Sequence, residues 1–138
     1  MAVSYNHIGH CVADLGRSRR FYENALEFTY ESDLAVEGEM PAKLLRVDLP
    51  LNLTAVYLKR DGLVLELLHY PNPGTAPYRP RAMNEPGLTH ISLTVANIPD
   101  ALLKVAEYGG EVLEDTNLGQ AVFVRDPDGQ LIELLAAR

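Results

Sequence analysis

The chain has 138 residues, a hydrophobic content of 47% and a formal net charge of −7. This size fits one globular unit or two small modules that share a core, and the hydrophobic content excludes general disorder. The acidic balance excludes a nucleic-acid surface, which needs clustered Lys and Arg, and no apolar stretch approaches the roughly 20 residues that cross a bilayer.

The cysteine content and the N-terminal residues indicate a compartment. The single cysteine, Cys11, cannot form an internal disulfide, which suits a reducing environment. The opening residues lack the basic start and apolar run of a signal peptide. We therefore expect a soluble, cytoplasmic protein with no membrane or nucleic-acid partner.

The first half of the chain predicts one helix among short strands. The helix is expected over Leu15–Leu26, where Phe21 and Ala25 recur at helical spacing after Asp14, a residue suited to capping. Asp61–Gly62 predicts a tight hairpin turn. Runs of β-forming residues predict strands over His7–Ala13, Phe28–Asp33, Leu53–Arg60 and Leu63–Tyr70.

The second half repeats this order after a proline-rich segment. Residues 71–87 contain five of the nine prolines and predict an extended linker, because proline does not fit a helix interior or a central strand. A helix is expected over Pro99–Tyr108, ending at Gly109–Gly110, and Asp128–Gly129 predicts another hairpin turn. Strands are expected over His90–Ala96, Gly110–Asp115, Gln120–Asp126 and Leu131–Ala137.

Two pairs of matching segments show that the chain is a doublet. "HIGHCVA" at His7 matches "HISLTVA" at His90, and "DGLVLELL" at Asp61 matches "DGQLIELL" at Asp128. The extra length of the first half falls at residues 34–52, which predicts an insertion or a longer hairpin. The fold class is therefore α+β, with one βαβββ module over 1–70, the linker over 71–87 and another module over 88–138, all in one structural domain.

Strand parity places each leading histidine on a face lined by small residues. Alternate side chains of a strand point to opposite faces, so His7 shares a face with Cys11, and His90 shares one with Thr94. Small neighbours leave room for a ligand. Cys11 and Thr94 are therefore candidate substrate contacts.

Each copy also carries a glutamate inside its last apolar strand, which gives the set His7, Glu66, His90 and Glu133. A single histidine or glutamate is more often structural, but the same pair at equivalent places in two diverged copies favours a function. Two imidazoles and two carboxylates suit zinc, nickel, cobalt, manganese or iron. His10 and His69 have no histidine counterpart in the other copy and are expected to be non-ligands.

The segments "HIGHCVADLGRSRRFYENALEF", "GLTHISLTVANI" and "VRDPDGQLIELL" resemble the glyoxalase, bleomycin-resistance and dioxygenase family, the vicinal oxygen chelate superfamily. The resemblance implies two βαβββ modules that form a cupped mixed sheet around one metal site, with the metal held by the four residues above. It also implies that substrate chelates the metal through two neighbouring oxygens as an enolate or enediolate. The proton is then taken by Glu133, with Glu66 as the alternative.

The resemblance leaves the substrate open. The ligand set is closest to that of glyoxalase I, but Cys11 and Tyr70 stand where that enzyme has its glutathione-contacting residues. The hypothesis is a metal-dependent lyase or isomerase of a small oxygenated molecule. The alternatives are an iron(II)-dependent extradiol-type dioxygenase and a metal-free drug-binding resistance protein. Tyr70 and Arg79 are further candidate substrate contacts, although Arg79 and Arg81 equally suit a solvated loop. A homodimer is expected, because exposed sheet edges need covering and because the resemblance implies modules that also pair across chains. The site would then form either within one chain or between two.

Overall fold

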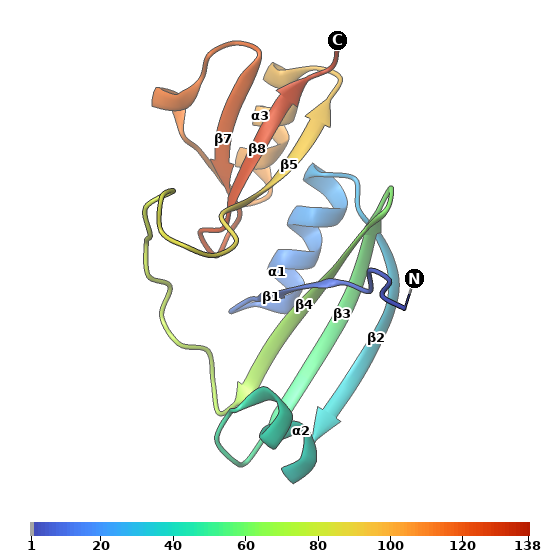
Figure 1. The fold of residues 1–138 in the computed structure, drawn as a ribbon. Helices are drawn as coiled ribbons and strands as arrows, with labels where there is room; N and C mark the ends of the chain where they lie inside the picture. The colour runs from blue at the N-terminus through green and yellow to red at the C-terminus, as the bar shows by residue number, and fades with distance from the viewer. Residues whose placement is uncertain (1) are drawn as a thin grey trace. The chain divides into compact units, whose positions relative to one another are not determined.

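The computed structural model describes residues 2–138, which form two four-stranded mixed sheets (Figure 1). Their strand orders are β1-β4-β3-β2 and β5-β8-β7-β6. In each sheet the first strand of the module runs parallel to the last, and the remaining pairs are antiparallel. The predicted α+β class and the two βαβββ modules are therefore confirmed.

The first module contains four strands, two helices and one π-helical turn. Its elements are β1 Ile8–Cys11, α1 Leu15–Arg20, the π-helical turn η1 Phe21–Ala25, β2 Thr29–Glu37, α2 Glu39–Leu45, β3 Asn52–Arg60 and β4 Leu63–Asn72. The predicted helix over Leu15–Leu26 thus changes from α-helical to π-helical winding at Phe21. Asp61 takes the left-handed conformation between β3 and β4, with φ of 51°, as a tight hairpin turn requires.

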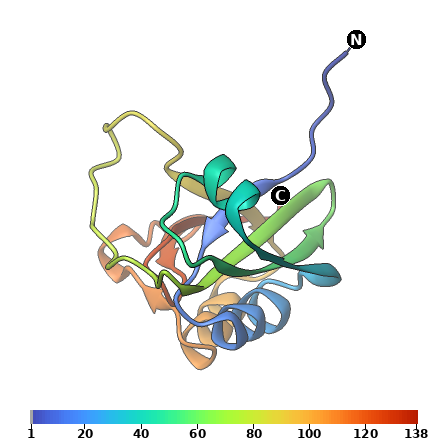
Figure 2. The ribbon, with the colours of Figure 1, turned by 90° about the horizontal axis from the view of Figure 1, so that it is seen from below.

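The insertion in the first half contains a helix that the sequence did not predict. Helix α2 buries Ala42 against Leu51 and Leu53 and lies at one end of the sheet, beside the end of β2 and the start of β3 (Figures 1 and 2). Seven residues that begin after Gly38 and contain Pro41 show too little periodicity for a helix to be recognised. Burial against the sheet therefore stabilises a helix that local propensity does not predict.

The second module repeats the strand pattern with shorter strands. Its elements are β5 His90–Val95, α3 Ile98–Glu107, β6 Glu111–Val112, the 3-10 turn η2 Glu114–Thr116, β7 Ala121–Arg125 and β8 Leu131–Ala136. Asn97 caps α3 by accepting a hydrogen bond from the Asp100 N–H at 2.9 Å. Gly109 ends the helix with a φ of 92°, as its sequence predicts. No helix within residues 2–138 is long and apolar enough to span a membrane.

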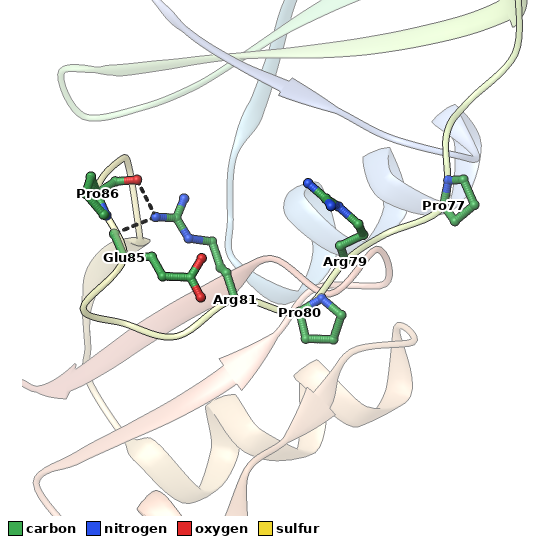
Figure 3. A pocket seen from close by; sticks show the side chains of 6 residues that line it. All are labelled: Pro77, Arg79, Pro80, Arg81, Glu85 and Pro86. Carbon is green, nitrogen blue, oxygen red and sulfur yellow. Dashed lines mark hydrogen bonds between the residues drawn. The ribbon is translucent and has the colours of Figure 1, made fainter.

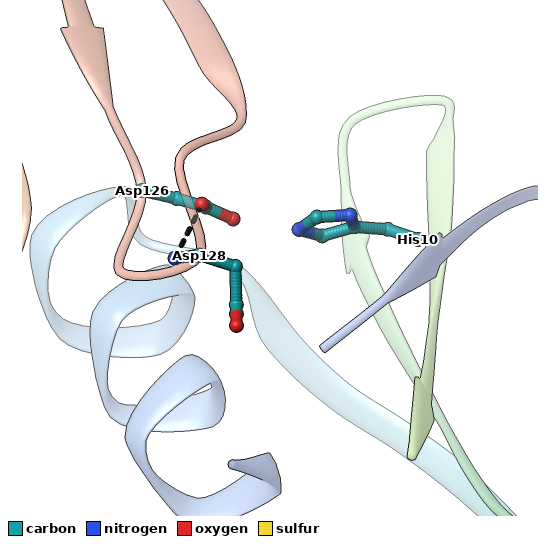
Figure 4. Close-up of side chains that lie close together, drawn as sticks. All are labelled: His10, Asp126 and Asp128. Carbon is teal, nitrogen blue, oxygen red and sulfur yellow. Dashed lines mark hydrogen bonds between the residues drawn. The ribbon is translucent and has the colours of Figure 1, made fainter. Parts of the chain in front are cut away.

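The side chain of one aspartate stabilises the turn between β7 and β8 through hydrogen bonds. Asp126 Oδ1 accepts a hydrogen bond from the backbone N–H of Asp128 at 2.9 Å (Figure 4). It also accepts one from the backbone N–H of Gln130 at 2.8 Å. Gly129 is required here because its φ is 98° and a Cβ would lie 2.9 Å from the Tyr78 ring. The predicted hairpin at Asp128–Gly129 is confirmed.

Contacts divide the chain into two compact units. One comprises the residues up to Gly16 together with Glu27–Ala76, and the other comprises Arg17–Leu26 together with Pro77–Arg138. Within the latter, the Tyr22 hydroxyl donates to Asp126 Oδ2 at 2.7 Å. Gly110 packs so closely that a Cβ there would lie 2.7 Å from the Phe21 ring. The segment 17–26 is therefore part of the core of the second unit.

Candidate functional site

Three neighbouring strands bring the predicted His7 and Glu66 together. β4 lies between β1 and β3, so that Glu66 is paired with Gly9 on one side and with Tyr57 on the other. His7 immediately precedes β1, and its Nε2 lies 3.2 Å from Glu66 Oε1. A Cβ on Gly9 would lie 3.5 Å from the same oxygen, so the small residue keeps this side of the carboxylate open. We call His7, Gly9, Tyr57 and Glu66 the first half-site.

Glu66 is held from its other side by a phenol. The Tyr57 hydroxyl donates to Glu66 Oε2 at 2.5 Å, and the Tyr57 ring meets the His7 ring edge-on with centroids 5.6 Å apart. This hydrogen bond, followed by partial burial and the charge of Glu66, raises the pKa of Tyr57 to about 12. Tyr57 therefore remains a hydrogen-bond donor at neutral pH.

The orientation of His7 gives the first half-site its chemistry. His7 Nδ1 lies 2.5 Å from Asn6 Oδ1, which can only accept, so Nδ1 carries the proton. In neutral His7 the lone pair is then on Nε2, which faces a carboxylate oxygen. Two lone pairs that converge at this distance repel each other unless a proton or a cation lies between them. The pair is therefore suited to hold a cation.

The second half-site, His90, Ser92, Phe123 and Glu133, has the same strand geometry. β8 lies between β5 and β7, so that Glu133 is paired with Ser92 on one side and with Phe123 on the other. His90 Nε2 lies 3.9 Å from Glu133 Oε1, and its ring meets Phe123 edge-on at 5.2 Å. Here the hydroxyl comes from Ser92, which donates to Glu133 Oε1 at 2.7 Å.

The distance between the histidine nitrogen and the glutamate oxygen is shorter in the first half-site than in the second. Bonds of about 2.1 Å place two adjacent ligands of one ion about 3.0–3.4 Å apart, from octahedral to tetrahedral geometry. The nitrogen–oxygen distance is 3.2 Å in the first half-site and 3.9 Å in the second, so only the first already matches this separation. Each half-site therefore has one imidazole nitrogen and one carboxylate oxygen that could hold a divalent ion.

The exposure pattern matches the predicted strand parity, which concerns the strand faces of Cys11 and Thr94 and not their contact with substrate. Exposure alternates along β1 and β5, and Cys11 and Thr94 are exposed on the faces that carry the histidines. Tyr70 lies near the end of β4 and packs against the cluster of Ala42, Leu51 and Leu53. Burial, followed by the charges of Cys11 and Glu66, raises the pKa of Tyr70.

The linker arginines differ in their surroundings. The Arg81 guanidinium donates to the backbone carbonyls of Glu85 at 2.6 Å and Pro86 at 2.7 Å (Figure 3). It also donates to the backbone carbonyl of Leu88 at 3.2 Å. Arg81 therefore stabilises its own loop through these hydrogen bonds. Arg79 makes no hydrogen bond or ion pair with the residues that the structure describes. It lines an open hollow of about 540 Å³ together with Pro77, Pro80, Arg81, Glu85 and Pro86.

Sequence reasoning did not identify Tyr57 and Phe123, which lie opposite the two glutamates. Their equivalence is obscured because the hairpin turns differ in length, two residues at Asp61–Gly62 and five at 126–130. Counting back from each Asp-Gly pair therefore gives different strand positions. The sequence does show an aromatic residue in the strand before each Asp-Gly pair. Which residue of the next strand faces it depends on the strand register, which the sequence does not give.

Two βαβββ modules in one chain, each with a histidine and a glutamate from neighbouring strands close together, define a class of proteins with a repeated module. The chain belongs to the glyoxalase/bleomycin resistance protein/dioxygenase superfamily, whose family model matches residues 4–134. No curated protein matches the chain in sequence.

Solved structures share the fold at low sequence identity. A glyoxalase family protein from Bacillus cereus is 19% identical with a TM-score of 0.82, over 99% of this chain and 95% of that one. The trypanothione-dependent glyoxalase I of Leishmania major is 24% identical with a TM-score of 0.68, over 94% and 84%. The fosfomycin resistance protein FosX of Listeria monocytogenes, solved with Mn(II) and sulfate, is 17% identical with a TM-score of 0.65, over 100% and 95%.

Proposed function

We propose that the protein is a divalent-metal-dependent lyase or isomerase that acts on a small oxygenated substrate. The proposed ligands are His7, Glu66, His90 and Glu133. The observation that carries the proposal is the first half-site, where the Nε2 lone pair of His7 faces Glu66 Oε1 at 3.2 Å while Nδ1 is occupied by Asn6. The presence of Mn(II) in the related FosX fold supports this interpretation.

The chain's own groups have distinct tasks in this proposal. The bound ion would polarise a carbonyl or enolate oxygen of the substrate, which stabilises developing charge by several kcal/mol. Glu133 accepts a proton from the carbon next to that carbonyl, because its side chain is 27% exposed and that of Glu66 only 12%. Glu66 is the alternative base.

Four further residues are proposed to contact the substrate. Cys11 and Thr94 flank the half-sites on their exposed strand faces. Tyr70 contributes a phenol whose raised pKa keeps it a hydrogen-bond donor. Arg79 has a guanidinium without a protein partner among residues 2–138, which suits an anionic group of the substrate.

The first test is elemental analysis of purified, untagged protein beside a His7→Ala, His90→Ala double variant. We expect a near-stoichiometric first-row metal in the wild type and none in the variant. His69→Ala is the matched control, because His69 Nδ1 contacts the Val12 carbonyl at 3.3 Å and lies on the opposite face of β4 from Glu66. A wild type that binds none of the offered ions would overturn the proposal and favour a metal-free binding protein.

We further propose a homodimer. Sedimentation tests this directly, and a mixture of His7→Ala and His90→Ala chains tests how the half-sites combine. If each site draws one half-site from each of two chains, mixed dimers regain metal at one of their two sites. If each site forms within one chain, the mixture stays as metal-poor as the separate variants.

A further inference from the structure

We infer that Tyr57 is a positioning residue that fixes Glu66 so that only Oε1 is presented beside His7. This inference rests on the proposed function, because it concerns the metal-binding role of Glu66. The two carboxylate oxygens already have different partners. Oε2 accepts the Tyr57 hydroxyl at 2.5 Å, and Oε1 lies 3.2 Å from His7 Nε2. Glu66 is therefore oriented as a one-oxygen ligand.

The location of Tyr57 makes this orientation rigid. β3 is an inner strand, and Tyr57 is paired with Ser32 of β2 on one side and with Glu66 of β4 on the other. The Tyr57 ring also packs edge-on against His7. A phenol fixed at its backbone and along its ring cannot follow a rotating carboxylate, so rotation of Glu66 breaks the hydrogen bond.

The second half-site contains no equivalent restraint. Phe123 stands opposite Glu133 where Tyr57 stands opposite Glu66, and it has no hydroxyl. The hydroxyl of Ser92 bonds Glu133 Oε1, the same oxygen that lies nearest His90 Nε2. The hydroxyl and His90 thus lie at the same oxygen, and no described residue holds Glu133 Oε2. The phenol therefore makes Glu66 the fixed carboxylate and leaves Glu133 the one that can move.

The experiment compares wild type, Tyr57→Phe and the control Tyr30→Phe, using cobalt(II) as the probe and a competing chelator to measure affinity. Tyr30→Phe removes a phenol from β2 whose hydroxyl bonds Asp33 and not Glu66. Loss of a hydrogen-bond partner of a ligand typically weakens metal binding roughly 10- to 100-fold. We expect a loss of this size in Tyr57→Phe, with an altered visible cobalt spectrum, and wild-type values in Tyr30→Phe.

A double-variant cycle separates positioning from a general structural effect. In a Glu66→Gln background, Tyr57→Phe is expected to cause little additional loss of cobalt affinity, because the oriented carboxylate is already absent. Equal cobalt affinity in wild type and Tyr57→Phe would overturn the inference, and so would losses that simply multiply in the double variant.

A metal-free readout keeps this inference distinct from the proposed function. The NMR signal of the Glu66 carboxyl carbon, measured without metal, should shift in Tyr57→Phe and stay unchanged in Tyr30→Phe. A wild type that binds no cobalt would overturn the proposed function, and this signal would then decide alone whether Tyr57 holds Glu66. An unchanged Glu66 signal in Tyr57→Phe would overturn the contact itself.

Discussion

The two half-sites have the same strand register and differ in the residue that supplies a hydroxyl to the glutamate. In the first, the hydroxyl comes from Tyr57 on the antiparallel neighbour, and in the second from Ser92 on the parallel neighbour. The comparison teaches that the two modules keep a histidine and a glutamate at equivalent strand positions, while the residues that flank each glutamate differ and supply its hydroxyl from different strands.

Side-chain length explains which oxygen is held. Tyr57 reaches across the strand gap to Glu66 Oε2, the oxygen that does not face its histidine. The short Ser92 side chain reaches only Glu133 Oε1, the oxygen nearest His90. The longer reach leaves the histidine-facing oxygen of Glu66 without a hydroxyl partner, whereas the Ser92 hydroxyl and His90 lie nearest the same oxygen of Glu133.

The largest expected effect separates the two glutamates. Glu133→Gln should lower turnover roughly 10²- to 10⁴-fold, the usual contribution of a general base, while metal remains bound. Glu66→Gln should act mainly on metal affinity. Metal content by elemental analysis and deuterium uptake by a panel of α-hydroxyketones in D₂O measure the two effects. Undiminished exchange in metal-loaded Glu133→Gln would contradict the assignment of the base.

An intermediate effect is expected on stability, because the turns that precede the two glutamate-bearing strands are held differently. β8, which carries Glu133, follows a five-residue turn that is fastened by the Tyr22–Asp126 hydrogen bond, whereas β4 follows a two-residue turn. Tyr22→Phe should lower the free energy of unfolding by roughly 1–3 kcal/mol, because Asp126 loses a buried donor. Chemical denaturation measures this loss, and Tyr108→Phe, which removes another phenol of the second unit, is the control.

The loss of unfolding free energy in Tyr22→Phe should become smaller at high pH. Burial, followed by the charge of and hydrogen bond to Asp126, raises the pKa of Tyr22 well above its usual value of 10.0. A raised pKa stabilises the fold fully below the unfolded-state value of about 10, and this contribution is lost as the pH rises through the folded-state value. The stability gap between wild type and Tyr22→Phe should therefore be constant to about pH 9 and narrow above pH 10. A gap that persists unchanged at pH 11 would contradict this account.

The smallest expected effect tests the second hydroxyl. Ser92→Ala removes a hydrogen bond that water can replace, because Ser92 is exposed. We expect a change in metal affinity of about 0.5 kcal/mol, or roughly twofold, far below that of Tyr57→Phe. Isothermal titration with cobalt(II) measures the change. A loss as large as that of Tyr57→Phe would show that both glutamates are held equally firmly and would remove the contrast between the half-sites.

The sequence by itself determined the features that depend on neighbouring residues. The repeated "HI" and "ELL" segments predicted two modules, with Glu66, His90 and Glu133 on strands and His7 directly before one. Asp61–Gly62 and Asp128–Gly129 predicted hairpins, and the glycines after Tyr108 predicted the end of α3. Turn chemistry, helix ends and strand parity are local, so they can be recognised without the fold.

Only the tertiary structure decided the partners of those residues. It placed Tyr57 and Phe123 opposite the glutamates, added α2 over one end of the first sheet and included the segment 17–26 in the second unit. Each of these depends on strand register or on burial against residues distant in the chain, and a slip of one residue would turn every side chain to the other face. The sequence could therefore name the two histidines and two glutamates, but not the phenol that holds one glutamate and is missing beside the other.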